Sequence, residues 1–432
     1  MPSAAGATAS AAGAGPTTPF EFAISEKVRN YGIRRAPEHL LGLEVEYQDM
    51  HYIPPQTDEG KYVLLEKAIF ACTKEKDGAG NHLFKIVGEG QFLDLKNNGH
   101  DHCCIEVVTA PLTHAQWKNE HGVLGAFKVM REMRKLIRSE RVFLLSDFVQ
   151  EYNQQLRASG VDDNFALIAD ERFATLTIDL GHKREGTSTQ SNFTVPFELL
   201  DKNIRRLSSL TADTRHKVAK KTKRQAQRVA GAQRRAREIV SEHFDGVGSS
   251  DVNKNMLRSF FLLFFLLEAT YAAERAIKPG QITKFMYPWL SRATMLDVIH
   301  SVLSQRERQA LYSYMKSNEG ELHRAVELIA GVKVNFEQWH GGHLDPLIEA
   351  LGNQMLVDER SGLMAVGRVL RGPDDVKYDV YFSPQGINAM EGRIPPLDIG
   401  GVPSIVVESR AVSKINKLPT PELLKELGLL YQ

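Results

Sequence analysis

Two glutamates two positions apart are the first residues whose type and spacing could do chemistry. The stretch Leu41-Gly-Leu-Glu-Val-Glu-Tyr47 alternates apolar and polar residues, which predicts a strand with one buried face. Glu44 and Glu46 then project from the other face, about 6.5–7 Å apart along the strand. Carboxylates this close repel each other, and a divalent cation that prefers oxygen ligands relieves the repulsion. The pair predicts a metal site, with a solvated strand face as the alternative.

A third acid and a late arginine occur in similar surroundings. Glu106 stands between β-branched residues in the strand predicted at 104–109, where an isolated carboxylate is costly to bury unless something pairs with it. Glu408 and Arg410 are two residues apart in the strand predicted at 404–410. The planar fork of arginine suits phosphate, although an ordinary ion pair fits the same spacing.

These stretches together resemble a known family. Gly42-Leu-Glu-Val-Glu46, Glu106-Val-Val-Thr-Ala-Pro111 and the late strand with Arg410 are similar to the amidoligase branch of the glutamine synthetase and glutamate–cysteine ligase fold. The resemblance covers residues 40–410 in scattered blocks, which include Gln190-Ser-Asn-Phe-Thr-Val-Pro-Phe-Glu-Leu199 and Tyr287-Pro-Trp-Leu-Ser-Arg-Ala-Thr294. It implies an α+β protein of glutamine-synthetase-like fold, in which an antiparallel sheet cradles ATP and Mg²⁺, here with a large helical insertion.

The resemblance also implies an activity and a set of site residues. The activity is ATP- and Mg²⁺-dependent ligation of a carboxylate to an amine through an acyl phosphate, which gives an amide or isopeptide bond in a small molecule, a peptide or a protein. Relatives often carry histidine where this chain has polar residues at 190–194, so these are expected to hydrogen-bond the cofactor or substrate. The implied roles are metal binding by Glu44, Glu46 and Glu106, phosphate or carboxylate binding by Arg410 and Arg292, cofactor binding by Gln190 and Asn192, and proton transfer by Asp94, for which a surface acid near a turn is the alternative.

Two other functions remain open from the residues. A phosphotransferase would use the same metal site and leave a phosphorylated product. A catalytically inactive protein could bind a polyanion through residues 215–237, which carry ten Lys or Arg and no acid. A solvated basic helix is the alternative there, and the absence of aromatic residues for base stacking does not favour nucleic acid.

A zinc site is not favoured. His100, His102, Cys103 and Cys104 are suitable ligand types, but their spacing matches no zinc pattern. His340-Gly-Gly-His343 is interpreted as a turn.

The elements expected to position these residues divide the chain in three. Strands are predicted at 41–47, 83–87, 92–95, 104–109, 142–145, 173–180, 192–195, 377–382 and 404–410, with a hairpin turn at 88–91, and helices at 113–140, through most of 197–328, and at 421–427. We expect a disordered tail over 1–20, the first part of a catalytic sheet domain over 21–196, a helical region over 197–330, and the rest of the catalytic domain over 331–432.

Composition limits the class of protein. The 432 residues are 42% hydrophobic and 25% charged, which is typical of a globular chain in water, and 54 Lys+Arg against 53 Asp+Glu leave no global bias toward a polyanion. Three cysteines, two of them adjacent, favour the cytoplasm or another reducing compartment, and a secreted effector delivered to a host cytosol also fits the tail. The apolar run 259–268 is about half the ~20 residues that a membrane-spanning helix needs, so it predicts a buried helix.

Overall fold

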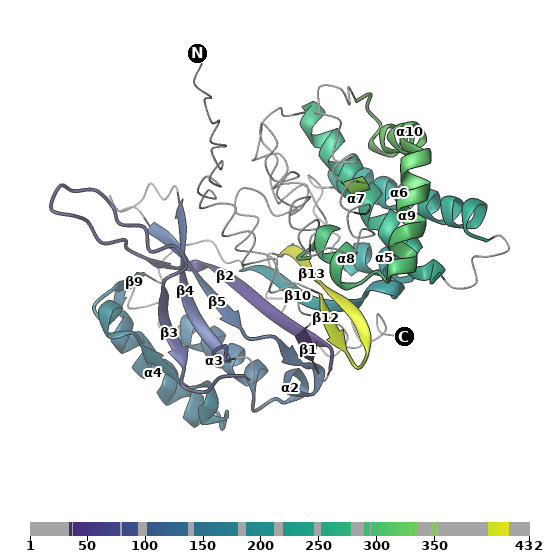
Figure 1. Cartoon of the computed structure of the whole chain (residues 1–432). Coiled ribbons are helices and arrows are strands. Elements are labelled where there is room, and N and C mark those ends of the chain that lie inside the picture. Colours follow the sequence, from purple (N-terminus) through teal and green to yellow (C-terminus); the bar gives the residue numbers. More distant parts are fainter. Residues whose placement is uncertain are drawn as a thin grey trace, which may run out of the picture.

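The computed structural model describes thirteen stretches of the chain. They are residues 34–36, 38–77, 80–93, 102–136, 142–179, 187–210, 219–245, 252–277, 289–293, 295–334, 347–348, 351 and 396–413. A mostly antiparallel sheet lies beside a set of helices (Figure 1), so the predicted α+β class is confirmed. The tail at 1–20, the strand at 377–382 and the helix at 421–427 fall outside the described residues, and the domain boundaries stay predictions.

One sheet joins strands from both ends of the described chain. Its main path is β1-β12-β13-β10-β2-β5-β4-β3-β8, and only the β1–β12 pair is parallel among the described pairs. Strands far apart in the sequence pair here, because β13 pairs with β10, which pairs with β2. The strands are β1 (Arg34–Ala36), β2 (Leu40–Tyr52), β3 (Ile69–Thr73), β4 (Phe84–Leu93), β5 (His102–Thr109), β6 (Leu112–Thr113), β7 (Val142–Leu144), β8 (Leu167–Ala169), β9 (Thr177–Asp179), β10 (Thr187–Pro196), β11 (Trp289–Ser291), β12 (Leu397–Ile399) and β13 (Val402–Ser413).

Helices cover the apolar face of this sheet. α2 (His114–Lys118), α3 (Val123–Leu136) and α4 (Leu145–Ala158) pack there, with Phe84 of β4 against both Phe127 and Tyr152. The indole of Trp117 donates a 2.8 Å hydrogen bond to the carbonyl of Leu41, which ties α2 to β2. Because alternate residues of a strand face opposite sides, burial of Leu41, Leu43 and Val45 on this face leaves Glu44 and Glu46 on the other.

The second part of the chain is helical, as predicted. Its helices are α5 (Leu200–Leu210), α6 (Ala219–His243), α7 (Lys254–Ile277), α8 (Met295–Ser301), α9 (Gln305–Ser317) and α10 (Glu319–Ala330). Three short 3₁₀ helices precede them in the chain: η2 (Asp163–Phe165), η3 (Glu171–Phe173) and η4 (Phe197–Leu199). The apolar run 259–268 is buried within α7, in agreement with the prediction. Within the described stretches, every helix is too short or too polar to cross a bilayer.

Two predicted elements are shorter than expected. The helix predicted at 113–140 is interrupted at Asn119, whose side chain accepts a hydrogen bond from the backbone of His121 and favours a turn over a continued helix. The strand predicted at 173–180 is reduced to β9, because Asp170 caps the short turn η3 ahead of it.

The prediction of a hairpin around Gly88-Glu-Gly-Gln91 is wrong. β4 runs through these residues as one strand and stays paired with β5, with a bulge between Gly88 and Phe92. The backbone of Gly88 donates to the carbonyl of Ala68 at 3.0 Å and accepts from the amide of Lys67 at 2.8 Å. The neighbouring turn therefore holds the bulge in place.

Glycine is required at position 88 by close contacts. A Cβ added there would lie 2.4 Å from the carbonyl oxygen of Leu65 and 2.6 Å from the ring of Phe70. We expect Gly88→Val to destabilise the protein by about 1–3 kcal/mol, since overpacking forces the backbone apart. Urea unfolding measures this. Gly320→Ala is the control, because a Cβ at that helical position meets nothing within 4 Å; an equal loss in both variants would contradict the assignment.

Candidate functional site

Three carboxylates meet on the face of the sheet opposite α2–α4. Glu46 of β2 lies directly across from Glu106 of β5, and Glu89 comes from the bulge of β4. One oxygen from each of these side chains lies within 4.8 Å of the others. Hard oxygen ligands in this number and spacing suit Mg²⁺ or Mn²⁺. Of the ligands predicted from sequence, Glu46 and Glu106 are thus in the cluster, whereas Glu89 was missed.

Burial and the neighbouring acids both favour the protonated form of Glu106. Burial raises the pKa of Glu106 from 4.5 to about 9, and the charges of Glu44, Glu89 and Glu46 add to the shift. A divalent cation would reverse this, because it favours the ionised form of every carboxylate around it. The donor set therefore fits a metal ion.

Glu44 stands beside the cluster. It lies opposite Val108 of β5 and opposite Gln190 of β10, and its Oε1 accepts a 2.9 Å hydrogen bond from the Nδ2 of Asn192. It is near enough to Glu106 to raise its pKa. Asn192, predicted to bind the cofactor, thus also orients an acid, and its own Oδ1 is buried without a hydrogen-bond partner among the described residues.

The side-chain hydroxyl of Tyr52 fixes the backbone of Glu89. The hydroxyl of Tyr52 donates to the carbonyl of Glu89 at 3.1 Å and accepts from the amide of Leu65 at the same distance. Tyr52 lies on β2, so the strand that carries Glu46 also positions Glu89. No spacing rule in the sequence brings Glu89 to this place.

The other residues that the sequence predicts for the site are Arg410, Asp94 and Arg292. The backbone register places Arg410 opposite Gln190, which is opposite Glu44. Asp94 lies outside the described residues. The guanidinium of Arg292 makes a 2.5 Å ion pair with the carboxylate of Glu408, which is fully buried.

We expect Arg292→Met to destabilise the protein by about 3–5 kcal/mol, because it removes an ion-pair partner of a buried carboxylate. The double variant Arg292→Met, Glu408→Leu should recover much of this loss, since apolar side chains then replace both members of the ion pair. Thermal unfolding of both variants measures the difference. A double variant no more stable than Arg292→Met would contradict this role for the pair.

The zinc alternative gains no support from the described residues. Cys103 is buried in the core, whereas Cys104 is its neighbour in β5 and therefore faces the carboxylates. Without a metal ion, burial, and then the charges of Glu46 and Glu89, raise the pKa of the Cys104 thiol to about 12. His100, His340 and His343 lie outside the described residues.

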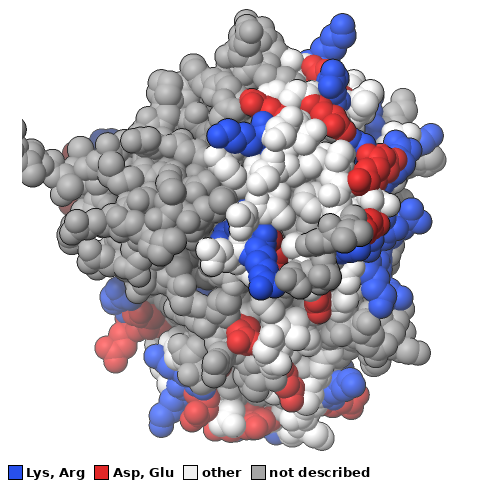
Figure 2. All heavy atoms as spheres, turned by 45° about the vertical axis from the view of Figure 1, so that its right-hand side comes forward, with Lys and Arg blue, Asp and Glu red and all other residues white. Residues whose placement is uncertain are grey.

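The basic stretch 215–237 is less exposed than a solvated helix. Its described part forms the first portion of α6, where Val229, Ala232 and Ala236 are buried. Arg235 pairs with Glu321 and with Glu238. Figure 2 shows acidic and basic side chains interspersed on the face of the molecule that it draws.

Comparison with known proteins finds distant likeness only. No protein-family model matches the chain, and no curated protein matches it. A solved Vibrio cholerae toxin of the MARTX/VgrG family aligns over 91% of this chain and 97% of its own, with 11% identity and a TM-score of 0.43. A mutant VgrG Vibrio cholerae toxin ACD domain, in complex with ADP and manganese, aligns over 88% of this chain and 96% of its own, with 11% identity and a TM-score of 0.42. Because likeness at this level says nothing about activity, the activity of this chain has to be inferred from its own carboxylates.

Proposed function

We propose that this protein is an ATP- and Mg²⁺-dependent carboxylate–amine ligase. The observation that carries the proposal is the cluster of Glu46, Glu89 and Glu106, whose oxygens lie within 4.8 Å of one another on one face of an antiparallel sheet. The sequence resemblance to the amidoligases supports the same reading. The substrates would be a carboxylate and an amine on small molecules, peptides or proteins.

The carboxylates would act by holding the metal. Mg²⁺ bound there would neutralise charge on the phosphoryl group that ATP transfers to the substrate carboxylate. The protein ligands of the metal ion would be Glu46, Glu89 and Glu106. Glu44, whose side chain accepts a hydrogen bond from Asn192, would stabilise the edge of the site. The amine nitrogen then bonds to the carbonyl carbon of the acyl phosphate, inorganic phosphate leaves, and a base takes the proton of the amine.

Arginine would bind phosphate oxygens. Arg410 lies in register with Gln190 and Glu44, on the side of the cluster toward β13. Its guanidinium can offer two parallel hydrogen bonds to a phosphate, which a lysine cannot do. Asp94 remains our proposed base.

The test is a product analysis. The protein would be incubated with Mg²⁺, ATP and a mixture of carboxylates and amines, including peptides, and the products analysed by mass spectrometry. A ligase joins two components with loss of water and releases phosphate. A phosphorylated component without a new amide would identify a phosphotransferase instead, and no ATP consumption in the presence of Mg²⁺ or Mn²⁺ would refute both.

A further inference from the structure

A cavity in the helical part of the molecule lies between α6, α7 and the C-terminal end of α10. Its volume is about 590 Å³, which is within the usual range of protein binding sites. One wall is basic and the other is apolar, and among the described residues that line the cavity none is acidic and none is aromatic. The basic wall contains Arg224, Arg228 and Arg234 of α6, and the large apolar residues are Leu328, Ile329 and Val332.

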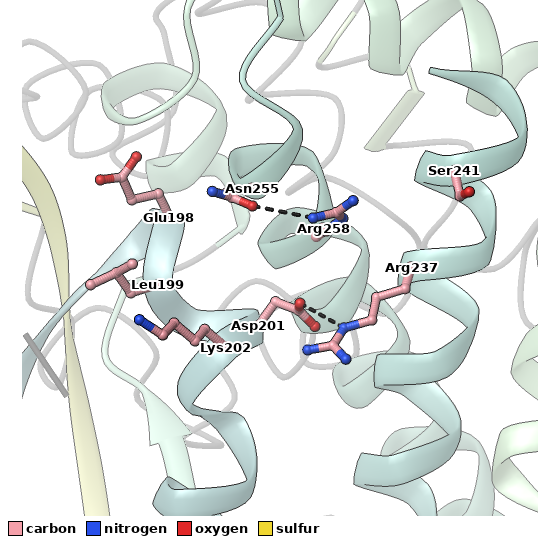
Figure 3. Close-up of a pocket in the computed structure, with 8 residues that line it drawn as sticks. All are labelled: Glu198, Leu199, Asp201, Lys202, Arg237, Ser241, Asn255 and Arg258. Carbon is pink, nitrogen blue, oxygen red and sulfur yellow. Dashed lines mark hydrogen bonds and ion pairs between the residues drawn. The ribbon is translucent and has the colours of Figure 1, made fainter. Parts of the chain in front are cut away.

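The arginines of α6 differ in how closely an acid neutralises them. On another side of the helix, the Nε of Arg237 donates a 2.8 Å hydrogen bond to Oδ2 of the buried Asp201 (Figure 3). At the cavity, the side chain of Arg234 is 78% exposed and lies 3.8 Å from the partly exposed carboxylate of Glu238. An exposed ion pair of this length contributes little, so the charge of Arg234 is available to a ligand.

The positive charges are spread along the helix axis. Arg224 and Arg234 are both exposed and are ten residues apart in α6, which separates their backbones by about 15 Å. Arg228 lies between them in the same wall and is buried. An extended peptide covers about 15 Å with roughly five residues, so it can place an acid near each exposed arginine. A ligand with a single anionic group offers only one charge to this wall.

The other wall is suited to an apolar group. The side chain of Leu328 is 83% exposed, more than any other large apolar side chain in the described part of the chain. It lines the cavity together with Ile329 and Val332. A ligand that covers these side chains removes apolar surface from water, which favours binding. Because the C-terminal end of a helix carries partial negative charge, the end of α10 disfavours acids on this side.

The two walls together favour an acidic peptide over other polyanions. Nucleic acid is disfavoured, because the described lining has no aromatic side chain for base stacking and one wall is apolar. An anionic bilayer presents a broad surface, which does not enter a concave cavity. In an extended peptide, successive side chains point to opposite sides, so acids can lie along α6 while apolar residues lie against the end of α10.

We propose that this cavity binds an extended acidic segment of a partner protein. The acids of the segment would accept charge-assisted hydrogen bonds from Arg224 and Arg234, and an apolar side chain between them would cover Leu328. The proposal does not depend on the ligase activity, because the cavity and the carboxylate cluster have no residue in common.

The test is fluorescence anisotropy of the full-length protein with a labelled peptide of about eight residues, in which glutamate and leucine alternate. We expect a dissociation constant of about 100 μM or lower. A peptide with glutamine in place of glutamate should bind at least about tenfold more weakly, because the charge-assisted contacts are lost. A peptide with serine in place of leucine should bind about fivefold more weakly, because less apolar surface is buried.

Variants of the two walls should respond differently. The double variant Arg224→Gln, Arg234→Gln should weaken binding of the glutamate–leucine peptide about tenfold or more. Added salt should weaken binding by the wild type more than binding by this variant, since salt screens exposed charges. Leu328→Gln should weaken binding of the leucine peptide and leave binding of the serine peptide unchanged.

Three controls separate this site from general surface effects and from the metal site. Arg157→Gln changes an exposed arginine of α4, and Ile168→Gln changes an exposed apolar side chain of β8. Both variants, and Glu46→Gln, should bind the peptide like the wild type. Thermal unfolding of the double arginine variant should show that it remains folded.

The proposal fails if the double arginine variant binds the peptide as tightly as the wild type, or if the glutamine peptide binds as well as the glutamate peptide. It also fails if oligothymidylate or phosphatidylserine vesicles bind more tightly than the peptide and require the same arginines. Self-association of the protein that is lost in the double variant would identify a second copy of the chain as the occupant instead.

Discussion

The Glu46→Gln and Glu89→Gln variants are each expected to lose at least about 100-fold in Mg²⁺-dependent ATP turnover. Changes of residues that only support metal ligands typically cost 10–100-fold, and removal of a ligand charge should cost no less. Glu89 gives the sharper test, because its inclusion rests on the three-dimensional cluster and not on any sequence pattern. The measurement is phosphate release at saturating ATP over a range of Mg²⁺ concentrations.

Glu59→Gln is the matched control for this prediction. Glu59 is also a glutamate, with a side chain that is 73% exposed and paired with Lys61 outside the cluster. It should retain wild-type turnover. Full turnover in Glu46→Gln or Glu89→Gln would contradict the metal site.

The second large effect concerns the pH dependence of stability without metal. Glu106 has a pKa of about 9 in the folded protein and an ordinary value of 4.5. Between these values the folded state holds a proton that the unfolded state releases, so stability is greatest below the lower pKa and falls as the pH rises toward 9. Without metal, the protein should therefore lose stability progressively as the pH rises from 5 to 8.

Glu106→Gln should remove this dependence, since glutamine carries no titrating proton. Denaturant unfolding in a chelator, at a series of pH values, compares the variant with the wild type. The variant should become the more stable protein toward pH 8, and added Mg²⁺ should raise the melting temperature of the wild type only. Parallel stability curves for the two proteins would argue against a raised pKa.

Part of the site follows from the sequence and part does not. Alternation in 41–47 places Glu44 and Glu46 on a polar face, and the apolar neighbours of Glu106 mark it as unusual. Which residue lies opposite which is a property of register, and register depends on the bulges in β2–β5 and β4–β5 that no local pattern announces.

Glu89 was missed because the glycines beside it were interpreted from their neighbours along the chain alone. Gly88 and Gly90 flank it, and glycines in such a stretch favour a turn when only neighbours along the chain are considered. The true requirement at Gly88 is the approach of Leu65 and Phe70, which are distant in sequence. The same limitation applies to the Arg292–Glu408 pair, which joins residues 116 positions apart.

The position of β13 has a consequence for synthesis of the chain on the ribosome. β10 ends at Pro196 and its partner β13 begins at Val402, about 200 residues later. At typical elongation rates the nascent chain carries β10 with an open edge for about 10–40 s before its partner emerges. An exposed edge recruits other strands, so overproduction from a fast-translating system should favour inclusion bodies, and slower elongation or holding by a chaperone should increase the soluble yield.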